Sequence, residues 1–524
     1  MLKPEHLGLP QFPNYRPVQL SAISKILDSK KTSFILNAPT GVGKSLIGIS
    51  IAKLKNEKAV YLVGTKQLQE QLLADFPDII GLIKGRENFP CTKLQKMFPS
   101  VTALDCTHTR DSPCSSLPFC EYLEHKRAAL SKQIVCTNYP FFLSEANYIG
   151  ELSHMPLIIG DECDCIDDEL LSFVQLTITP RQIAQLNMDP PKFKTKLEAW
   201  VDWAKGALNT INQQVSLLEE GSNWDTDDIP TVRKLLHLRR LRGKVDQFLR
   251  EVDDSWVWYP EAMSDGKESW VFKPTWVSKY AHGYLWRHGE KHLLMSATVI
   301  GHRSMAKDIS LPEYDYLEMD SPFPVSHRPI FYTPTTDVTF KNKQESYPKL
   351  ALEIKAIMAQ HHSYHILVHC VSYSLRDYLW EHLPPDRLMK HDTKNRNQVL
   401  EEFKKTSSPK VLLSPSMERG VSLNDDSARV VVVAKVPFLS LADPQVSKRA
   451  HTGAAGRLWY TRKAVESLIQ STGRHVRTED DWGLSYILDT QFGKILENHR
   501  ELFFKWWLDG LKEGEKFLVG RKGG

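Results

Sequence analysis

Ala38-Pro39-Thr40-Gly41-Val42-Gly43-Lys44-Ser45 is the stretch that decides the fold of this 524-residue chain. The apolar run Ser33 to Leu36 before it predicts a buried strand, and Leu46 to Ala52 after it predicts the start of a helix. A strand, a glycine-bearing turn and a helix N-terminus together form a phosphate cradle, because the backbone N–H groups of the turn point at the ligand. We therefore expect this stretch to bind ATP, with Lys44 at the terminal phosphates and the Ser45 hydroxyl on Mg²⁺.

The composition sets only broad limits on function. A chain of 524 residues is too long for one ordinary core, so about two to four domains are expected. The formal net charge of +4 is too small to argue for nucleic-acid binding by itself. We see no apolar run long enough to cross a membrane and no signal-peptide pattern at the N-terminus, which predicts a cytoplasmic or nucleoid-associated protein.

A second apolar run, Pro156 to Gly160, ends in Asp161-Glu162-Cys163-Asp164. Strands that alternate with helices predict a parallel sheet, and the sites of such sheets lie at the carboxyl ends of the strands. Asp161 is then placed to meet the Mg²⁺ held by Ser45, and Glu162 to orient or deprotonate the attacking water.

Two further segments are candidates for the same site. Arg16 and Gln19 precede the phosphate loop, and Gln19 either contacts adenine or caps a helix. Gln470-Ser471-Thr472-Gly473-Arg474-His475-Val476-Arg477 lies far downstream and carries two arginines three residues apart. Phosphoryl transfer needs positive charge at the γ-phosphate, so we expect Arg474 and Arg477 to act as an arginine finger from a second domain; surface charge is the alternative.

The second half of the chain carries new strand-like runs at 365–369, 410–414 and 429–434, which predict a second parallel sheet without a phosphate loop of its own. Residues 169–284 break the alternating pattern. Within them, 231–250 combines helical apolar spacing with many arginines and lysines. This helix either presents a solvated charged face or faces nucleic acid.

Four cysteines, Cys91, Cys106, Cys114 and Cys120, fall within 30 residues. In a cytosolic chain such a cluster favours a metal over disulfides. Four thiolates can hold a [4Fe–4S] cluster or a structural zinc. Structural zinc sites usually contain close Cys-x2-4-Cys pairs, and this segment has none, so the iron–sulfur cluster is favoured while zinc, disulfides and free thiols stay open.

Together these segments resemble a superfamily 2 helicase. The phosphate loop corresponds to motif I, and Asp161-Glu162-Cys163-Asp164 corresponds to motif II. Motif III is represented by Ser296-Ala297-Thr298, and motif VI by residues 470–477. Lys84-Gly85-Arg86-Glu87-Asn88-Phe89-Pro90-Cys91 narrows the resemblance, because it is similar to the start of the iron–sulfur domain in the XPD/DinG family. Motif II departs from the family's usual Asp-Glu-Ala-His, and the motif V region, 416–425, matches only loosely.

The resemblance implies an α/β fold of two RecA-like parallel-sheet motor domains with an inserted iron–sulfur domain and a mainly helical, arch-like insertion. The boundaries that we expect are 1–88, 121–168 and 285–325 for motor domain 1, 89–120 for the iron–sulfur domain, 169–284 for the arch-like insertion and 326–524 for motor domain 2.

The activity that the resemblance implies is ATP-dependent 5′ to 3′ movement on single-stranded DNA and unwinding of tailed or forked duplexes by a monomer. It further implies that Thr65, Asn138 and Tyr139 face the DNA, that Gly420 contacts the nucleotide, and that Gln470 acts with the two arginines. RNA remains open as a substrate. The alternatives are an ATPase that remodels protein–DNA complexes without separating strands, and a scaffold with a silent ATP site.

Overall fold

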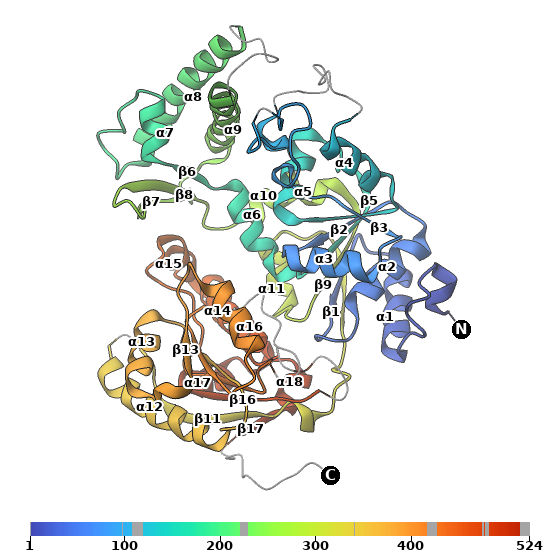
Figure 1. Ribbon diagram of the computed structural model, residues 1–524, viewed down its shortest axis with the longest axis vertical. Helices are drawn as coiled ribbons and strands as arrows, with labels where there is room; N and C mark the ends of the chain where they lie inside the picture. Colours follow the sequence, from blue (N-terminus) through green and yellow to red (C-terminus); the bar gives the residue numbers. More distant parts are fainter. Residues whose placement is uncertain are drawn as a thin grey trace.

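The computed structural model describes residues 2–96, 98–106, 119–220, 229–339, 341–416, 427–473, 476 and 481–513. The described chain forms two parallel-sheet domains, one from each half of the sequence, with a smaller helical unit at one side (Figure 1). This is the predicted α/β architecture of two RecA-like motor domains. Among the described helices, none has the length and the apolar character that a membrane crossing requires.

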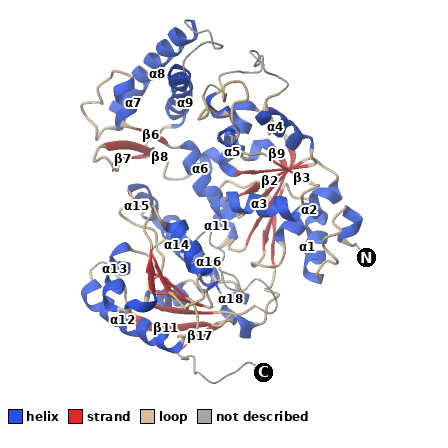
Figure 2. Cartoon of the chain, in the orientation of Figure 1, coloured by secondary structure: helices blue, strands red, loops and turns tan. Residues whose placement is uncertain are grey.

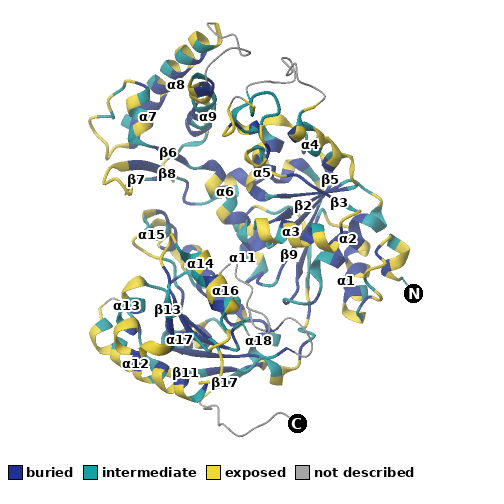
Figure 3. Cartoon of the chain, viewed as in Figure 1, coloured by how far each residue is buried: buried dark blue, intermediate teal, exposed yellow. Residues whose placement is uncertain are grey.

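Motor domain 1 is built on a parallel sheet with the strand order β10-β1-β9-β5-β2-β4-β3. Its strands are nearly all buried, because helices cover both faces of the sheet (Figures 2 and 3). The strands are β1 (Ser33–Asn37), β2 (Ala59–Val63), β3 (Ile80–Leu82), β4 (Ile134–Asn138), β5 (Met155–Asp161), β9 (Gly289–Ser296) and β10 (Tyr314–Glu318). The helices are α1 (Pro17–Asp28), α2 (Lys44–Lys55), α3 (Lys66–Asp75), α4 (Glu121–Ser131), α5 (Tyr139–Ser144), α6 (Ile166–Val174) and α11 (His302–Asp308).

Motor domain 2 repeats the plan with the order β13-β14-β12-β15-β16-β11-β17, again all parallel. Its strands are β11 (Ile330–Thr336), β12 (Ile366–His369), β13 (Leu388–Lys390), β14 (Val411–Ser414), β15 (Val430–Val433), β16 (Leu484–Asp489) and β17 (Leu511–Glu513). Its helices are α12 (Lys343–Gln360), α13 (Tyr373–His382), α14 (Arg396–Lys405), α15 (Pro444–Ala450), α16 (Gly453–Thr472), α17 (Gln491–Asn498) and α18 (Lys505–Asp509).

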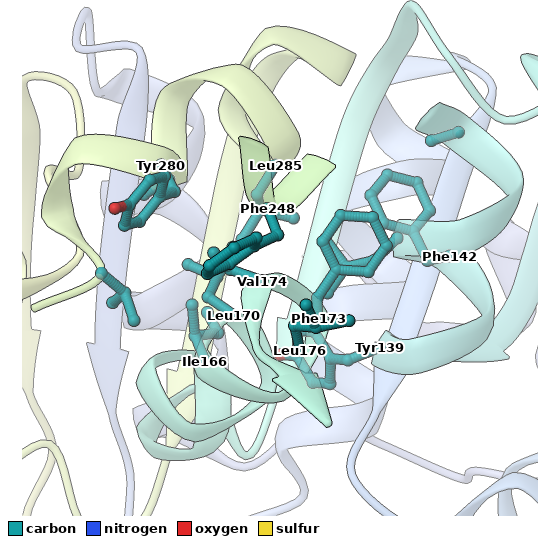
Figure 4. Close-up of a cluster of buried hydrophobic side chains, with 14 of the residues drawn as sticks. Tyr139, Phe142, Ile166, Leu170, Phe173, Val174, Leu176, Phe248, Tyr280 and Leu285 are labelled. Atoms are coloured by element: carbon teal, nitrogen blue, oxygen red, sulfur yellow. The ribbon is translucent and has the colours of Figure 1, made fainter. Parts of the chain in front are cut away.

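The helical unit combines α7 (Pro180–Gln185), α8 (Leu197–Glu220), α9 (Ile229–Glu251) and α10 (Ser278–Tyr284) with an antiparallel sheet of β6 (Leu176–Ile178), β8 (Glu268–Lys273) and β7 (Val257–Ala262). Its core continues into motor domain 1. Phe248 of α9 belongs to the same apolar cluster as Leu170 and Phe173 of α6 and Tyr139 of α5 (Figure 4). The insertion is therefore anchored to motor domain 1 by a shared core as well as by the chain.

The basic residues of α9 make contacts within the protein. Arg233 donates two hydrogen bonds, of 2.8 and 3.2 Å, to the carboxylate of Asp105, next to Cys106. Arg239 pairs with Glu219 of α8 at 2.6 Å, and Lys244 donates to the carbonyl of Phe173. These contacts tie α9 to the cysteine segment, to α8 and to α6, while Arg233 keeps 49% of its side chain exposed, as the predicted solvated face requires.

A buried arginine lies where motor domain 2 meets motor domain 1 and the insertion. Arg449 of α15 is 1% exposed and lies between the rings of Trp276 and Trp459, 4.2 and 4.1 Å from their centroids. Its guanidinium donates to both oxygens of Asp167 in α6, at 2.8 and 3.2 Å. Nearby, Arg462 of α16 pairs with Asp308. The junction is therefore ionic and buried.

Replacing Arg449 with Leu should destabilise the protein, because it leaves the carboxylate of Asp167 buried without its partner. Loss of one member of a buried ion pair costs about 3–5 kcal/mol. We expect a clearly lower melting temperature in thermal unfolding followed by circular dichroism. Arg250→Leu, which removes an exposed pair with Asp246, is the control and should melt near the wild-type temperature. Equal melting of the two variants would contradict the assignment.

Candidate nucleotide site

A cleft of about 700 Å³ lies between the two motor domains. Motor domain 1 lines it with the phosphate loop, motif II and Ser296 to Thr298, and motor domain 2 lines it with Ile469 to Gly473 and Trp506-Trp507. Segments that are hundreds of residues apart in the sequence therefore meet around one space, whose volume suits a small-molecule ligand.

The phosphate loop has the predicted strand–turn–helix form. It leaves β1, and α2 begins at Lys44, so the unpaired N–H groups of the first turn of α2 face the loop. Gly41 and Gly43 have φ of +79° and +86°, a conformation that side chains rarely adopt. The ammonium of Lys44 donates to the carbonyl of Ala38 at 3.3 Å and therefore stays over the loop.

Arg16 and Gln19 support the loop from beneath. The side-chain amide of Gln19, which is 4% exposed, donates to the carbonyl of Val42 at 2.8 Å, and its oxygen accepts from the Arg16 N–H at 2.8 Å. The guanidinium of Arg16 donates to the carbonyl of Gly41 at 2.7 Å. Both polar ends of Gln19 thus take part in capping α1 and holding the loop, as predicted for a helix cap, and its contact with adenine stays a prediction.

Asp161 stands at the end of β5, across the cleft from Lys44. Its carboxylate accepts hydrogen bonds from the N–H of Glu162 at 3.0 Å and from the hydroxyl of Tyr61 at 3.1 Å. Burial raises the pKa of Asp161, and the positive charge of Lys44 opposes that rise. The charge of Lys44 therefore favours the ionised carboxylate that a metal ligand needs, against the larger effect of burial.

Glu162 follows in the left-handed conformation, with φ of +52°. Such backbone strain in a residue that is not glycine is often found at functional sites. The turn directs the carboxylate over Gly64 at the end of β2, where a Cβ on that glycine would lie 2.5 Å from a Glu162 oxygen. Glu162 lines the cleft, as a residue that activates water there would have to.

Asp164 joins the two motor domains. One of its oxygens accepts from the hydroxyl of Ser296, and the other accepts from the side-chain amide of Gln470 in α16 at 3.0 Å. Gln470 also donates to the hydroxyl of Thr298 at 2.9 Å. The structure thus brings motifs II, III and VI into one hydrogen-bond network, and an aspartate occupies the place where the family usually has histidine.

The three residues predicted to face DNA have different surroundings. Thr65 and Asn138 are half-buried N-caps of α3 and α5 and accept from the N–H groups of Leu68 and Phe141. Their strands, β2 and β4, are neighbours in the sheet. Tyr139 was predicted incorrectly, because it is 1% exposed and its hydroxyl donates to the carbonyl of Asp161 at 3.0 Å. The apolar core of Figure 4 holds its ring.

Three of the four clustered cysteines are described, and all three are half-buried and outside any disulfide. Cys120 packs against the small apolar cluster of Phe89, Ala103 and Tyr122. The N–H of Cys91 donates to the carbonyl of Val101 at 3.0 Å, two residues before that cluster's Ala103. Thiols at one small core are suitable donors for iron. Within the described ranges, however, no three His, Cys, Asp or Glu side chains gather closely enough to hold a metal.

Four predicted residues, Cys114, Gly420, Arg474 and Arg477, lie outside the described residues. Sequence reasoning also missed one residue inside them, Tyr61, whose hydroxyl contacts Asp161. The sequence does show one phenol in the otherwise aliphatic run of β2. A phenol in a buried strand needs a hydrogen-bond partner, so this residue could have been singled out.

Comparisons with known proteins agree with this geometry. Residues 16–186 match the DEAD/DEAH box helicase family and residues 351–510 match the helicase C-terminal domain. The chain is 23% identical to the ATP-dependent DNA helicase YoaA of Haemophilus influenzae, over 92% of this chain and 91% of that protein. The YoaA protein of Escherichia coli is 19% identical, with 92% of each chain covered.

Solved structures of XPD proteins share the fold. One XPD helicase structure matches with a TM-score of 0.63 and 16% identity, covering 95% of this chain and 99% of that one. Xpd4 of S. tokodaii matches with a TM-score of 0.60 and 14% identity, covering 95% of this chain and 100% of that one.

Gly43→Ala should weaken nucleotide binding about tenfold or more. The new methyl group would lie 2.5 Å from the Gln19 amide nitrogen, at a φ of +86° where a side chain costs about 1–2 kcal/mol. Gly266→Ala is the matched control, because its φ is +78° but nothing lies within 4 Å of the added methyl. Titration with a fluorescent ATP analogue checks the result, and equal affinities of the two variants would contradict it.

Proposed function

Because the chain is a superfamily 2 helicase of the XPD/DinG type that hydrolyses ATP, we propose that it moves 5′ to 3′ along single-stranded DNA and unwinds tailed or forked duplexes. The observation that carries the proposal is the contact of Asp164 in motor domain 1 with Gln470 in motor domain 2, at the edge of the cleft that both domains line. A hydrogen bond that spans the two motors beside the phosphate loop links nucleotide occupancy to domain closure.

Different groups of the chain carry out the separate tasks of ATP hydrolysis. The loop amides and Lys44 hold the β- and γ-phosphates, and Ser45 and Asp161 would hold Mg²⁺, which supplies positive charge to the phosphate oxygens. Glu162 accepts a proton from the attacking water at its carboxylate oxygen. Arg474 and Arg477 follow the described end of α16 by a few residues and would supply the arginine finger.

The DNA track would cross the carboxyl ends of β2 and β4. Thr65 and Asn138 cap helices there, so each helix N-terminus and its cap offer polar contacts to a phosphate. Contacts of this kind recognise the backbone and are independent of sequence, as movement along a strand requires. Because backbone contacts of this kind also fit RNA, binding of RNA is an outcome of the substrate test.

Cys91, Cys106, Cys114 and Cys120 would hold a [4Fe–4S] cluster. Support comes from the thiol donor set, from the half-buried position of the three described thiols, and from the ionic contact that α9 makes with Asp105 beside Cys106. A cluster would stabilise a segment that has only a small apolar core, and would fix it against the insertion.

Glu162→Gln should stop ATP turnover and strand displacement while nucleotide binding persists, because the amide cannot accept the water's proton. Lys44→Ala should weaken binding itself. The assay compares ATP hydrolysis, with and without single-stranded DNA or RNA, and displacement from duplexes with 5′ or 3′ tails. Glu381→Gln, an exposed change in α13, is the control and should match the wild type.

Strong DNA stimulation with displacement from the 5′-tailed duplex alone is the expected result. Stimulation without displacement would favour a remodelling ATPase, and an absence of hydrolysis would favour a scaffold. Wild-type turnover by Glu162→Gln would overturn the role of Glu162.

Iron and acid-labile sulfide in anaerobically purified protein should both be near four per chain, as one [4Fe–4S] cluster requires. Replacing any of the four clustered cysteines with Ser should remove most of the iron. Cys370→Ser is the control, because Cys370 is fully buried in motor domain 2 and burial raises the pKa of its thiol. Stoichiometric zinc without sulfide would reject the cluster and leave the helicase assignment intact.

A further inference from the structure

Tyr61 occupies the centre of motor domain 1. It lies in β2, paired in register with Cys136 of β4 on one side and Ile159 of β5 on the other. Its side chain has no exposed surface. A buried phenol in a sheet of aliphatic side chains is costly unless its hydroxyl is hydrogen-bonded.

The hydroxyl of Tyr61 contacts both predicted metal ligands. It donates to the carboxylate of Asp161 at 3.1 Å. It is also within hydrogen-bond reach of the hydroxyl of Ser45. A phenol has one proton, and that of Tyr61 goes to Asp161, so the phenol oxygen accepts from Ser45 and cannot donate to it.

The packing of α2 makes room for this arrangement. Gly48 faces the sheet, and a Cβ there would lie 3.2 Å from the ring of Tyr61 and 2.9 Å from Met295. Because Gly48 has no side chain, α2 can lie close over the phenol. The same helix carries Ser45 at its N-terminus, so the close approach sets the distance between the serine hydroxyl and the phenol.

The order of donors is the one that a metal site needs. A serine hydroxyl that binds a cation offers a lone pair to it and must direct its proton elsewhere. The phenol oxygen of Tyr61 accepts that proton, and its own proton fixes one oxygen of Asp161. The N–H of Glu162 fixes the other oxygen, at 3.0 Å. Each ligand is then oriented before the metal binds.

We propose that Tyr61 is a positioning residue of the magnesium site, which orients Ser45 and Asp161 through one buried hydroxyl. The inference rests on the proposed ATPase function and adds to it a residue outside the phosphate loop and motif II. Tyr61 is not among the residues that line the cleft, so its removal should change metal affinity and leave metal-free nucleotide binding intact.

The test is the Mg²⁺ dependence of binding of a fluorescent ATP analogue, with a parallel titration in EDTA. The Mg²⁺ concentration that gives half of the maximal increase in analogue binding should rise about tenfold in Tyr61→Phe, since the site loses a hydrogen bond to a charged group. Affinity in EDTA should stay unchanged. Tyr486→Phe is the matched control, because its buried hydroxyl bonds His361 in motor domain 2, and it should keep the wild-type Mg²⁺ midpoint.

The outcomes separate this inference from the function on which it rests. An unchanged Mg²⁺ midpoint in Tyr61→Phe, with tight binding by the wild type, overturns the role of Tyr61 alone. Failure of the wild type to bind the analogue at all overturns both proposals. If Tyr61→Phe does not fold, Gly48→Ala displaces the phenol instead, and the same Mg²⁺ shift with unchanged binding in EDTA is expected.

Discussion

The carboxylates that follow β5 are the constraint on which the rest of this structure depends. An apolar strand brings Asp161 to the carboxyl edge of the sheet, and the chain then places Asp164 and Asp167 within the next six residues. All three are less than 9% exposed. Buried carboxylates are costly without partners, so the surrounding structure has to supply donors. Those donors come from different parts of the chain and define how the domains meet.

Each carboxylate has a separate partner. Asp161 faces the phosphate loop, whose Lys44 opposes the effect of burial on its pKa. Asp164 accepts a hydrogen bond from Gln470 of motor domain 2. Asp167 accepts one from Arg449, whose guanidinium lies against two tryptophan rings. A cavity of about 10 Å³ remains among Asp164, Asp167 and their neighbours, room for about one water. The nucleotide site and the domain junction are therefore one continuous polar region, so a change at the phosphates has a short path to motor domain 2.

Local sequence predicted the parts of this arrangement that depend on neighbouring residues. The phosphate loop, the apolar strand before Asp161 and the parallel sheets follow from short patterns of side chains, because each pattern encodes its own backbone. No local pattern reports the contact between Gln470 and Asp164 of motif II, because these residues lie 306 positions apart.

Two features that the sequence did not predict have the same physical origin. Tyr139 follows a strand end that was expected to face DNA, yet the packing of α5 turns its ring into the core, and its hydroxyl finds the carbonyl of Asp161. Several charged side chains of α9 are exposed, as a solvated face predicts, but the fold also presents Asp105 and Glu219 to Arg233 and Arg239. In both cases the partner is set by tertiary packing, which composition and periodicity do not contain.

The most direct test of this account is a double-mutant cycle on Asp164 and Gln470, measured as DNA-stimulated kcat for ATP hydrolysis. If the hydrogen bond between them joins the motor domains in the active state, Asp164→Ala, Gln470→Ala and the double variant should lose similar activity, giving a coupling energy of about 1–3 kcal/mol. Losses that add to within about 0.3 kcal/mol would contradict the claim that this bond links the two domains during turnover.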